Sequence, residues 1–95
     1  MQLKLTWRVR GRRDMELSVS DGQKIGETME ILAERGLMDE EEAEGVRFVR
    51  ALRKNNQVSV LLTYREAEIY SGDILVPEED EEEEDEREGG GINAT

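Results

Sequence analysis

Strict alternation of apolar and polar residues near the start of the chain limits its possible folds more than any other feature of the sequence. Every second residue is apolar in residues 2–9, and this period of two predicts a half-buried β-strand. Residues 14–19 repeat the pattern after a short loop that contains Gly11, so the two segments predict a β-hairpin. The side chains expected to face the core are Leu3, Leu5, Trp7, Val9, Met15, Leu17 and Val19.

Helical periodicity replaces this alternation after the hairpin. Apolar residues recur three and four positions apart in residues 25–32, as they do on the buried face of a helix. Ser20-Asp21-Gly22-Gln23 fits a capping box, and Gly36 fits a left-handed C-terminal cap. We therefore expect a helix over residues 23–35, although Gly26 is less favourable there than alanine by about 1 kcal/mol.

The second half of the chain predicts three more strands. Residues 46–53 are rich in valine and are followed by the turn signal Asn55-Asn56. Residues 57–62 form a short, clear strand pattern. Ile74-Leu75-Val76 predicts a last strand, which we expect to stop at Pro77 because proline has no N–H for a ladder hydrogen bond.

The connecting segments are less regular. Residues 39–44 are acidic and are expected to form a loop, although the apolar spacing over residues 39–53 also allows a helix. Residues 63–67 suggest one capped helical turn, and Ser71-Gly72-Asp73 suggests a tight turn.

The predicted order of elements is strand, strand, helix, strand, strand, short turn, strand. A helix that follows a hairpin must cover one face of the sheet, because both elements have an apolar side to bury. The sequence therefore predicts an α+β fold of the β-grasp type. We expect a mixed sheet of four or five strands, with one helix packed on one face and the other face open to solvent.

The charge divides the chain into two parts. The net charge is −11, yet residues 78–95 alone hold ten acidic residues and one basic residue. Residues 1–77 are therefore close to neutral and are expected to form one small domain. Residues 78–95, with high charge and few apolar residues, are expected to be a disordered acidic tail with glycines near its end.

The residue types exclude most catalytic chemistry. The chain has no cysteine or histidine, and no glycine-rich phosphate loop with its lysine. The acidic run lacks an ordering turn of the kind that shapes a calcium loop. We therefore expect no enzyme activity, no cofactor, no metal site and no small-molecule substrate. No apolar run is as long as a membrane span, and the N-terminus lacks a signal-peptide stretch, so we expect a cytoplasmic protein without direct membrane insertion.

Basic residues near the hairpin and the third predicted strand are candidates for partner binding. They could simply solvate the open face and pair with Glu16, or they could dock carboxylates of a protein partner. Nucleic-acid binding is disfavoured because the body is slightly acidic and the tail would compete with phosphate. Leu75 is expected to point outward between inward Ile74 and Val76, and is a candidate hot spot. The basic candidates are Arg8, Arg10, Arg12, Arg13, Arg47, Arg50, Arg53 and Lys54.

The segment from Thr63 to Leu75 resembles the end of ubiquitin-like proteins, in which a threonine opens a short turn, an isoleucine packs beneath it and a last strand follows. Ile69 with Gly72-Asp73-Ile74-Leu75 is also similar to the ending of the YukD-like group of bacterial ubiquitin-like proteins, which are associated with type VII secretion. The resemblance implies a ubiquitin-like domain over residues 1–77. It also implies a non-enzymatic adaptor that binds protein partners, including components of a bacterial secretion machinery.

The resemblance also raises an alternative function. Ubiquitin-like modifiers and carriers are activated at a C-terminal glycine, and Gly89-Gly90-Gly91 is present here. Residues 92–95 follow, so a modifier would require trimming to Gly90 or Gly91. Otherwise the glycines belong to a flexible polar end. The acidic tail could confer solubility only, or fold back on the hairpin arginines until a partner displaces it.

Overall fold

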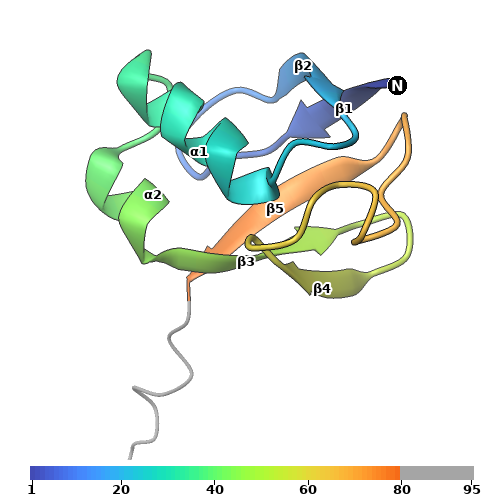
Figure 1. The fold of residues 1–95 in the computed structure, drawn as a ribbon. Coiled ribbons are helices and arrows are strands. Elements are labelled where there is room, and N and C mark those ends of the chain that lie inside the picture. The colour runs from blue at the N-terminus through green and yellow to red at the C-terminus, as the bar shows by residue number, and fades with distance from the viewer. Residues whose placement is uncertain (80–95) are drawn as a thin grey trace, which may run out of the picture.

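A computed structural model describes residues 1–79 of the chain, in which two helices and five strands follow one another (Figure 1). The expected disordered tail, apart from Glu78 and Glu79, lies outside the described residues, as do Gly90 and Gly91. The elements are β1 (Gln2–Trp7), β2 (Met15–Ser20), α1 (Ile25–Glu34), α2 (Glu40–Gly45), β3 (Val46–Ala51), β4 (Asn56–Ser59) and β5 (Ile74–Glu79).

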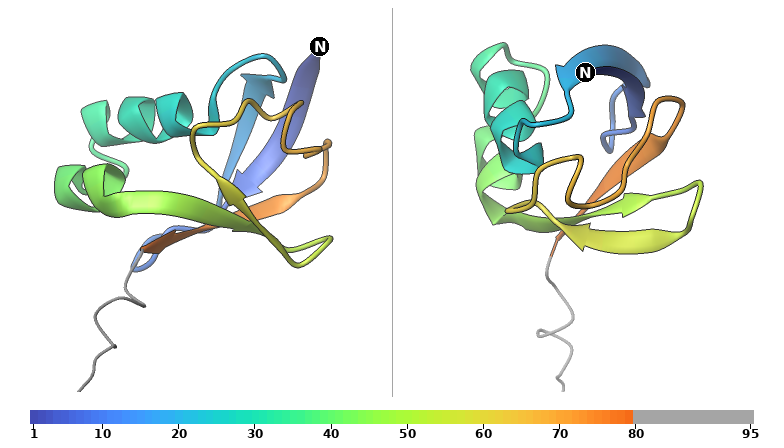
Figure 2. Two further views of the ribbon diagram at one scale, coloured as in Figure 1. Left: turned by 60° about the horizontal axis from the view of Figure 1, so that its bottom comes forward. Right: turned by 45° about the vertical axis from the view of Figure 1, so that its right-hand side comes forward.

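The five strands form one mixed sheet in the order β2-β1-β5-β3-β4. β1 and β5 run parallel at its centre, while β1–β2, β3–β4 and β3–β5 are antiparallel pairs. α1 lies across one face of the sheet, and α2 leads directly into β3 beside it (Figures 1 and 2). The predicted α+β, β-grasp arrangement is therefore confirmed, and so is the β1–β2 hairpin.

The start of α1 differs from the prediction. The helix begins at Ile25, and the expected capping box at residues 20–23 is instead a turn, in which the Gln23 N–H donates to the Ser20 carbonyl at 3.0 Å. The Glu27 carboxylate accepts the Lys24 N–H at 3.4 Å and supports the first turn. Lys24 also forms a β-bridge with Thr63, so the chain is still extended where the sequence predicted helix.

Two glycines of α1 and its cap have clear structural reasons. Gly36 has a φ of +75°, which confirms the expected left-handed cap. Gly26 donates its N–H to the Val60 carbonyl at 2.9 Å, and a Cβ at Gly26 would lie 3.3 Å from that oxygen. Because glycine has no Cβ, the backbone of α1 can approach the segment after β4 this closely. This contact explains why glycine stands here despite its low helix propensity.

The acidic segment before β3 is a short helix, so the expected loop over residues 39–44 is wrong. The Ala43 N–H donates to the Asp39 carbonyl at 2.9 Å and closes the first turn of α2. Three acidic residues occupy this turn, where the helix dipole favours negative charge. Met38 and Val46, which flank the helix, are both buried and fix its two ends against the core.

The last strand continues past Pro77, so the predicted stop at this residue is also wrong. The Leu75 carbonyl accepts the Arg8 N–H at 2.8 Å, which places the backbone groups of Leu75 on the β1 side. Backbone groups alternate along a strand, so Pro77 also faces the β1 side. β1 ends at Trp7, and proline therefore removes no hydrogen bond from the sheet.

The core lies between α1 and the sheet. Trp7 and Leu75 are fully buried at its centre, and the hydroxyl groups of Tyr64 and Thr28 share a buried hydrogen bond of 2.6 Å. All four side chains expected to face inward from residues 2–9 are buried, whereas Met15 and Leu17 on the edge strand β2 are partly exposed.

Burial raises the pKa of the Tyr64 hydroxyl to about 12, so the folded state favours the neutral phenol. This contribution to stability is complete below the unfolded pKa of about 10 and is lost as the pH rises toward 12. We expect urea unfolding to show a loss of about 2–3 kcal/mol over this window. The variant Tyr64→Phe should lack this part of the decline. An equal decline in both proteins would contradict the assignment.

Candidate protein-interaction surface

The sheet face opposite α1 is exposed to solvent, as the sequence predicted. Directly paired residues point to the same side of a sheet, so the cross-strand pairs identify the members of this face. Gln2 pairs with Ser20, Lys4 with Ser18, and Thr6 with Glu16. Nearly all of these side chains are exposed, with Thr6 in an intermediate position. We call the surface made by the outward residues of all five strands the open sheet face.

Two apolar side chains from β5 lie in the middle of the open sheet face. Ile74 pairs with Thr6 on β1, and Val76 pairs with Arg50 on β3. Both are partly exposed, while Leu75 between them is fully buried. The open sheet face therefore has an apolar centre on its middle strand, which is the arrangement that protein interfaces favour.

Leu75 is consequently not the exposed hot spot that the sequence analysis expected. Leu75 pairs with buried Trp7 on β1 and with buried Ala51 on β3, so its side chain must point into the core with theirs. Residues 74–76 are all apolar, so the sequence contains no alternation that shows which of them faces the core. The sequence analysis therefore expected the wrong side chains of β5 to point inward. For the same reason the sequence analysis missed Ile74 and Val76 as exposed residues of the open sheet face. With Leu75 buried, alternation along β5 places both of them on that face.

A hydrogen-bonded network borders the apolar centre on the β3–β4 side. The Arg50 Nε donates to Glu78 at 2.8 Å, and the Gln57 Nε2 donates to the same carboxylate at 2.7 Å. Hydrogen bonding from Arg50 lowers the pKa of the Glu78 carboxyl. Glu78 was assigned to the tail from its sequence, but its position on β5 makes it part of the sheet.

Arg8 occupies the opposite side of the open sheet face. Its guanidinium makes a bidentate contact with Asp14 across the hairpin, with nitrogen–oxygen distances of 3.2 and 3.1 Å. The hydrogen bonds from Arg8 lower the pKa of the Asp14 carboxyl. The expected pairing of the face arginines with Glu16 is therefore wrong for Arg8, since Glu16 lies opposite Thr6.

The other basic candidates do not gather on this face. Arg12 donates to the Gly36 carbonyl at 2.9 Å, at the C-terminal end of α1, and lies 3.7 Å from Asp39. Arg47 lines a groove on the helix side of the sheet. Arg10 and Arg13 are exposed in the hairpin loop, and neither forms an ion pair within residues 1–79.

Arg53 and Lys54 contact the loop at residues 68–71 and are not available on the open sheet face. Arg53 donates to the Ser71 carbonyl at 3.4 Å. Lys54 donates to the Glu68 carbonyl at 2.9 Å and lies 5.2 Å from the ring centroid of Tyr70. These two residues therefore hold the turn after β3 to residues 68–71. Of the eight basic candidates, the structure places Arg8 and Arg50 on the open sheet face.

Several of the residues that carry the family resemblance have roles in folding. Ile69 is buried, and Gly72 has a φ of +96°, a backbone conformation that side chains rarely adopt. The buried Asp73 carboxylate accepts the backbone N–H groups of Arg53 at 3.1 Å and of Ile74 at 2.9 Å. Thr63 and Glu66 cap the short turn before them by accepting each other's backbone N–H groups, each at 3.0 Å. This ending therefore specifies the fold.

Solved structures that resemble this chain are ubiquitin-like domains. A protein designed de novo on the basis of ubiquitin matches with a TM-score of 0.64 and 22% identity, over 83% of this chain and 89% of that one. The ubiquitin of Caldiarchaeum subterraneum matches with 0.62 and 15%, over 81% and 91%. The C-terminal ubiquitin-like domain of mouse tubulin-specific chaperone e matches with 0.61 and 11%, over 83% and 87%.

No protein-family model and no curated protein matches the sequence. At these levels of identity the structural matches establish the fold, which is ubiquitin-like. Within residues 1–79, no helix is long and apolar enough to cross a membrane, and no group of acidic side chains is arranged to hold a metal ion.

Proposed function

We propose that this chain is a non-enzymatic adaptor that binds a protein partner through its open sheet face. The observation that carries the proposal is the apolar centre formed by Ile74 and Val76, which a ubiquitin-like sheet presents to solvent between Arg8 and Arg50. Partly exposed apolar side chains surrounded by polar ones are typical of the centre and rim of an interface.

The charges of the open sheet face favour a protein over a nucleic acid. Arg8 and Arg50 are the two basic candidates on this face, and each already pairs with a carboxylate, at 3.1 Å and 2.8 Å respectively. Lys4 is the one further basic residue that the strand pairings place there. A phosphate backbone would have to displace Asp14 and Glu78 before it could bind these guanidinium groups. A partner that buries the apolar centre can keep both ion pairs at its rim.

The partner can be specified further from the family resemblance. The ending from Ile69 to Leu75 is similar to that of the YukD-like group, and on this basis we propose that the partner is a component of a bacterial type VII secretion machinery. This narrower proposal implies a cytoplasmic location. A modifier or carrier role is the competing proposal, and it requires a processed chain that ends at Gly90 or Gly91.

Capture from a lysate of the native host tests the adaptor proposal. The bait is the full-length chain, and the variants are Val76→Glu on the apolar centre and Ser18→Glu on the outer strand of the same face. Both variants add one negative charge to the same face, but only Val76→Glu also removes an apolar side chain from its centre. We expect one set of partners to be retained by Ser18→Glu and to fall about tenfold or more with Val76→Glu. Equal capture by both variants would contradict the proposal.

Intact-mass analysis of the protein from its host separates the two proposed functions. An adaptor is expected to have the full-length mass without adducts. A chain that ends at Gly90 or Gly91, or that is joined to another protein through such an end, would overturn the adaptor proposal in favour of a modifier.

A further inference from the structure

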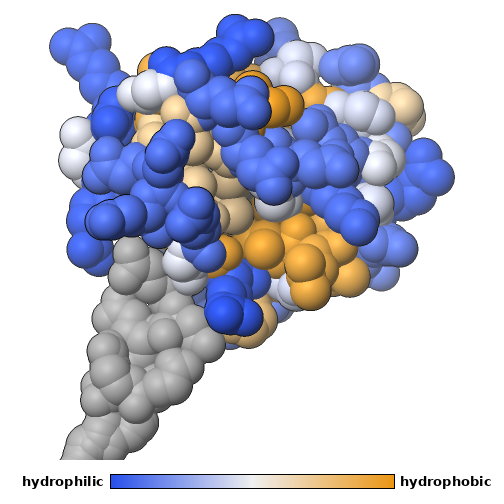
Figure 3. All heavy atoms as spheres, turned by 60° about the vertical axis from the view of Figure 1, so that its left-hand side comes forward, coloured by the Kyte–Doolittle hydropathy of each residue, from blue (hydrophilic) through white to orange (hydrophobic). Residues whose placement is uncertain are grey.

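A groove with a volume of about 910 Å³ runs between α1 and α2, on the face of the molecule that carries the helices. Figure 3 shows this side of the molecule, where hydrophobic surface lies between hydrophilic ridges. Met29 and Val46 are buried at the floor of the groove, and Leu61 at its mouth is 76% exposed. The apolar lining is formed by Met29, Ala33, Ala43, Val46, Phe48, Val60 and Leu61.

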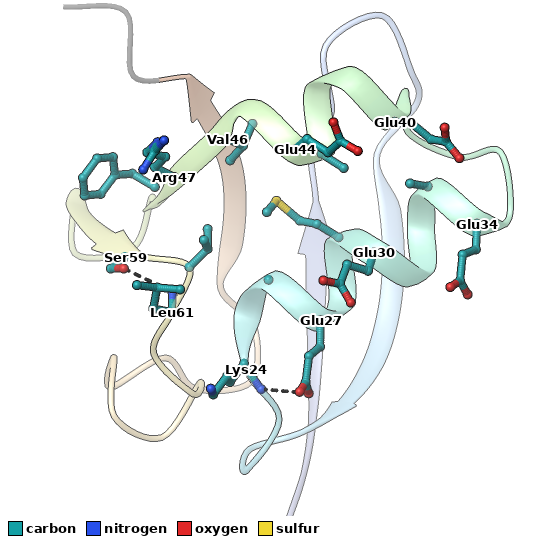
Figure 4. A pocket seen from close by; sticks show the side chains of 16 residues that line it. Lys24, Glu27, Glu30, Glu34, Glu40, Glu44, Val46, Arg47, Ser59 and Leu61 are labelled. Atoms are coloured by element: carbon teal, nitrogen blue, oxygen red, sulfur yellow. Dashed lines mark hydrogen bonds between the residues drawn. The ribbon is translucent and has the colours of Figure 1, made fainter. Parts of the chain in front are cut away.

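Five glutamates line this groove: Glu27, at the end beside Lys24, and two pairs farther along it (Figure 4). Glu30 and Glu34 lie one turn apart on α1, and Glu40 and Glu44 lie one turn apart on α2 (Figure 4). Like charges at this spacing repel one another by about 0.2–0.5 kcal/mol per pair. None of the four forms an ion pair within residues 1–79. A cationic occupant would relieve both repulsions, so the charges of the groove are complementary to a basic ligand.

The backbone at the mouth of the groove is already hydrogen-bonded. The Val60 carbonyl accepts the Gly26 N–H at 2.9 Å, and the Val60 N–H donates to the Arg47 carbonyl at 3.1 Å. The Leu61 N–H donates to the Ser59 Oγ at 3.1 Å. These groups cannot also pair with an added strand, so an occupant must satisfy its own backbone, as a helix does.

We infer that the groove binds a basic amphipathic helix of a partner protein. Its apolar side would pack on the small residues Ala33 and Ala43, which allow close approach, and on Leu61. Its lysines or arginines would lie along the four glutamates. Lys24 and Arg47 line the groove at the end away from Glu34 and Glu40 (Figure 4), so the helix C-terminus would lie there. Apart from Phe48 and Ser59, which pair with each other across β3 and β4, this site lies on the opposite side of the sheet from the apolar centre of the open sheet face, and it is independent of the proposed function.

Three synthetic peptides test this inference with the full-length chain. The first is an amphipathic helix with leucine and alanine on one side and lysines flanking them. The second has glutamate in place of each lysine, and the third keeps the lysines but has a central proline that breaks the helix. We expect the first to bind and to shift the amide resonances of Ala33, Ala43 and Leu61. The third has the same charge, so it reports attraction to the acidic residues of the chain as a whole, including the run after Glu79.

Two matched pairs of variants locate the site. Leu61→Ser should weaken binding of the lysine peptide about fivefold or more, whereas Ile31→Ser, which removes an exposed apolar residue outside the groove, should not. The double variant Glu30→Gln/Glu34→Gln should weaken binding and reduce its salt dependence more than Glu16→Gln/Glu41→Gln, which removes the same charge elsewhere.

Equal binding of the first and third peptides, or equal effects within each pair of variants, would overturn the inference. So would shifts confined to residues 80–95. The variant Val76→Glu on the open sheet face should leave peptide binding unchanged, so that failure of the groove and failure of the proposed adaptor face can be told apart.

Discussion

Replacing Leu75 by alanine is expected to lower the free energy of unfolding by about 2–5 kcal/mol, because the variant leaves a cavity between the two central strands and α1. Leu75 is fully buried, with Trp7 and Ala51 as its neighbours on the adjacent strands. These neighbours belong to the sheet and cannot collapse into the space without bending it. Urea denaturation of the full-length chain measures the loss.

The matched control is Val76→Ala, one residue further along the same strand. Val76 is partly exposed on the open sheet face, so its truncation should cost about 1 kcal/mol or less. If Val76→Ala destabilised the protein as much as Leu75→Ala, the direction of the β5 side chains would be wrong. The apolar centre proposed for partner binding would then be part of the core.

Replacing Asp73 by alanine is expected to cost about 3 kcal/mol. The Asp73 side chain is almost fully buried, and one of its oxygens accepts the backbone N–H groups of both Arg53 and Ile74. Without this carboxylate the two donors lose their acceptor where the loop after β3 meets the start of β5. Urea denaturation again measures the change, and the turn at residues 71–73 should become protease-sensitive.

Asp73→Asn separates the hydrogen bonds from the charge. Asparagine keeps a side-chain oxygen of the same shape, so we expect this variant to retain more than half of the stability that Asp73→Ala loses. Equal losses in the two variants would mean that the negative charge matters and that the two backbone hydrogen bonds do not. Such a result would remove the structural reason for an aspartate after Gly72.

Local patterns of apolar and polar residues predicted most of the fold. They failed where a segment contains no such pattern. Alternation in residues 2–9 fixed both the strand and its inward side, because polar residues mark the opposite face. Residues 74–76 are all apolar, so nothing local decides which of them faces the core. The parallel pairing of Leu75 with Trp7 decides it, and that contact joins opposite ends of the chain.

The partner-binding candidates were harder to predict than the fold. The basic residues are close in sequence, but the hairpin loop directs Arg12 toward the end of α1 while Arg8 stays on the sheet. An irregularity in the pairing of β3 with β5 falls at Arg47, which lines the groove on the other side from Arg50. The groove itself depends on α2, which the acidic sequence suggested to be a loop. The glutamates of α2 therefore could not be placed opposite those of α1 from the sequence.

Site-specific photo-crosslinking in the native host tests the adaptor proposal most directly. A photoreactive phenylalanine analogue would replace either Val76 on the open sheet face or Ile31, an exposed residue of α1 on the other side of the molecule. The proposal predicts a discrete protein adduct from position 76 that is absent from position 31. No adduct at position 76, or the same adducts from both positions, would contradict the claim that this chain acts by binding a protein through its open sheet face.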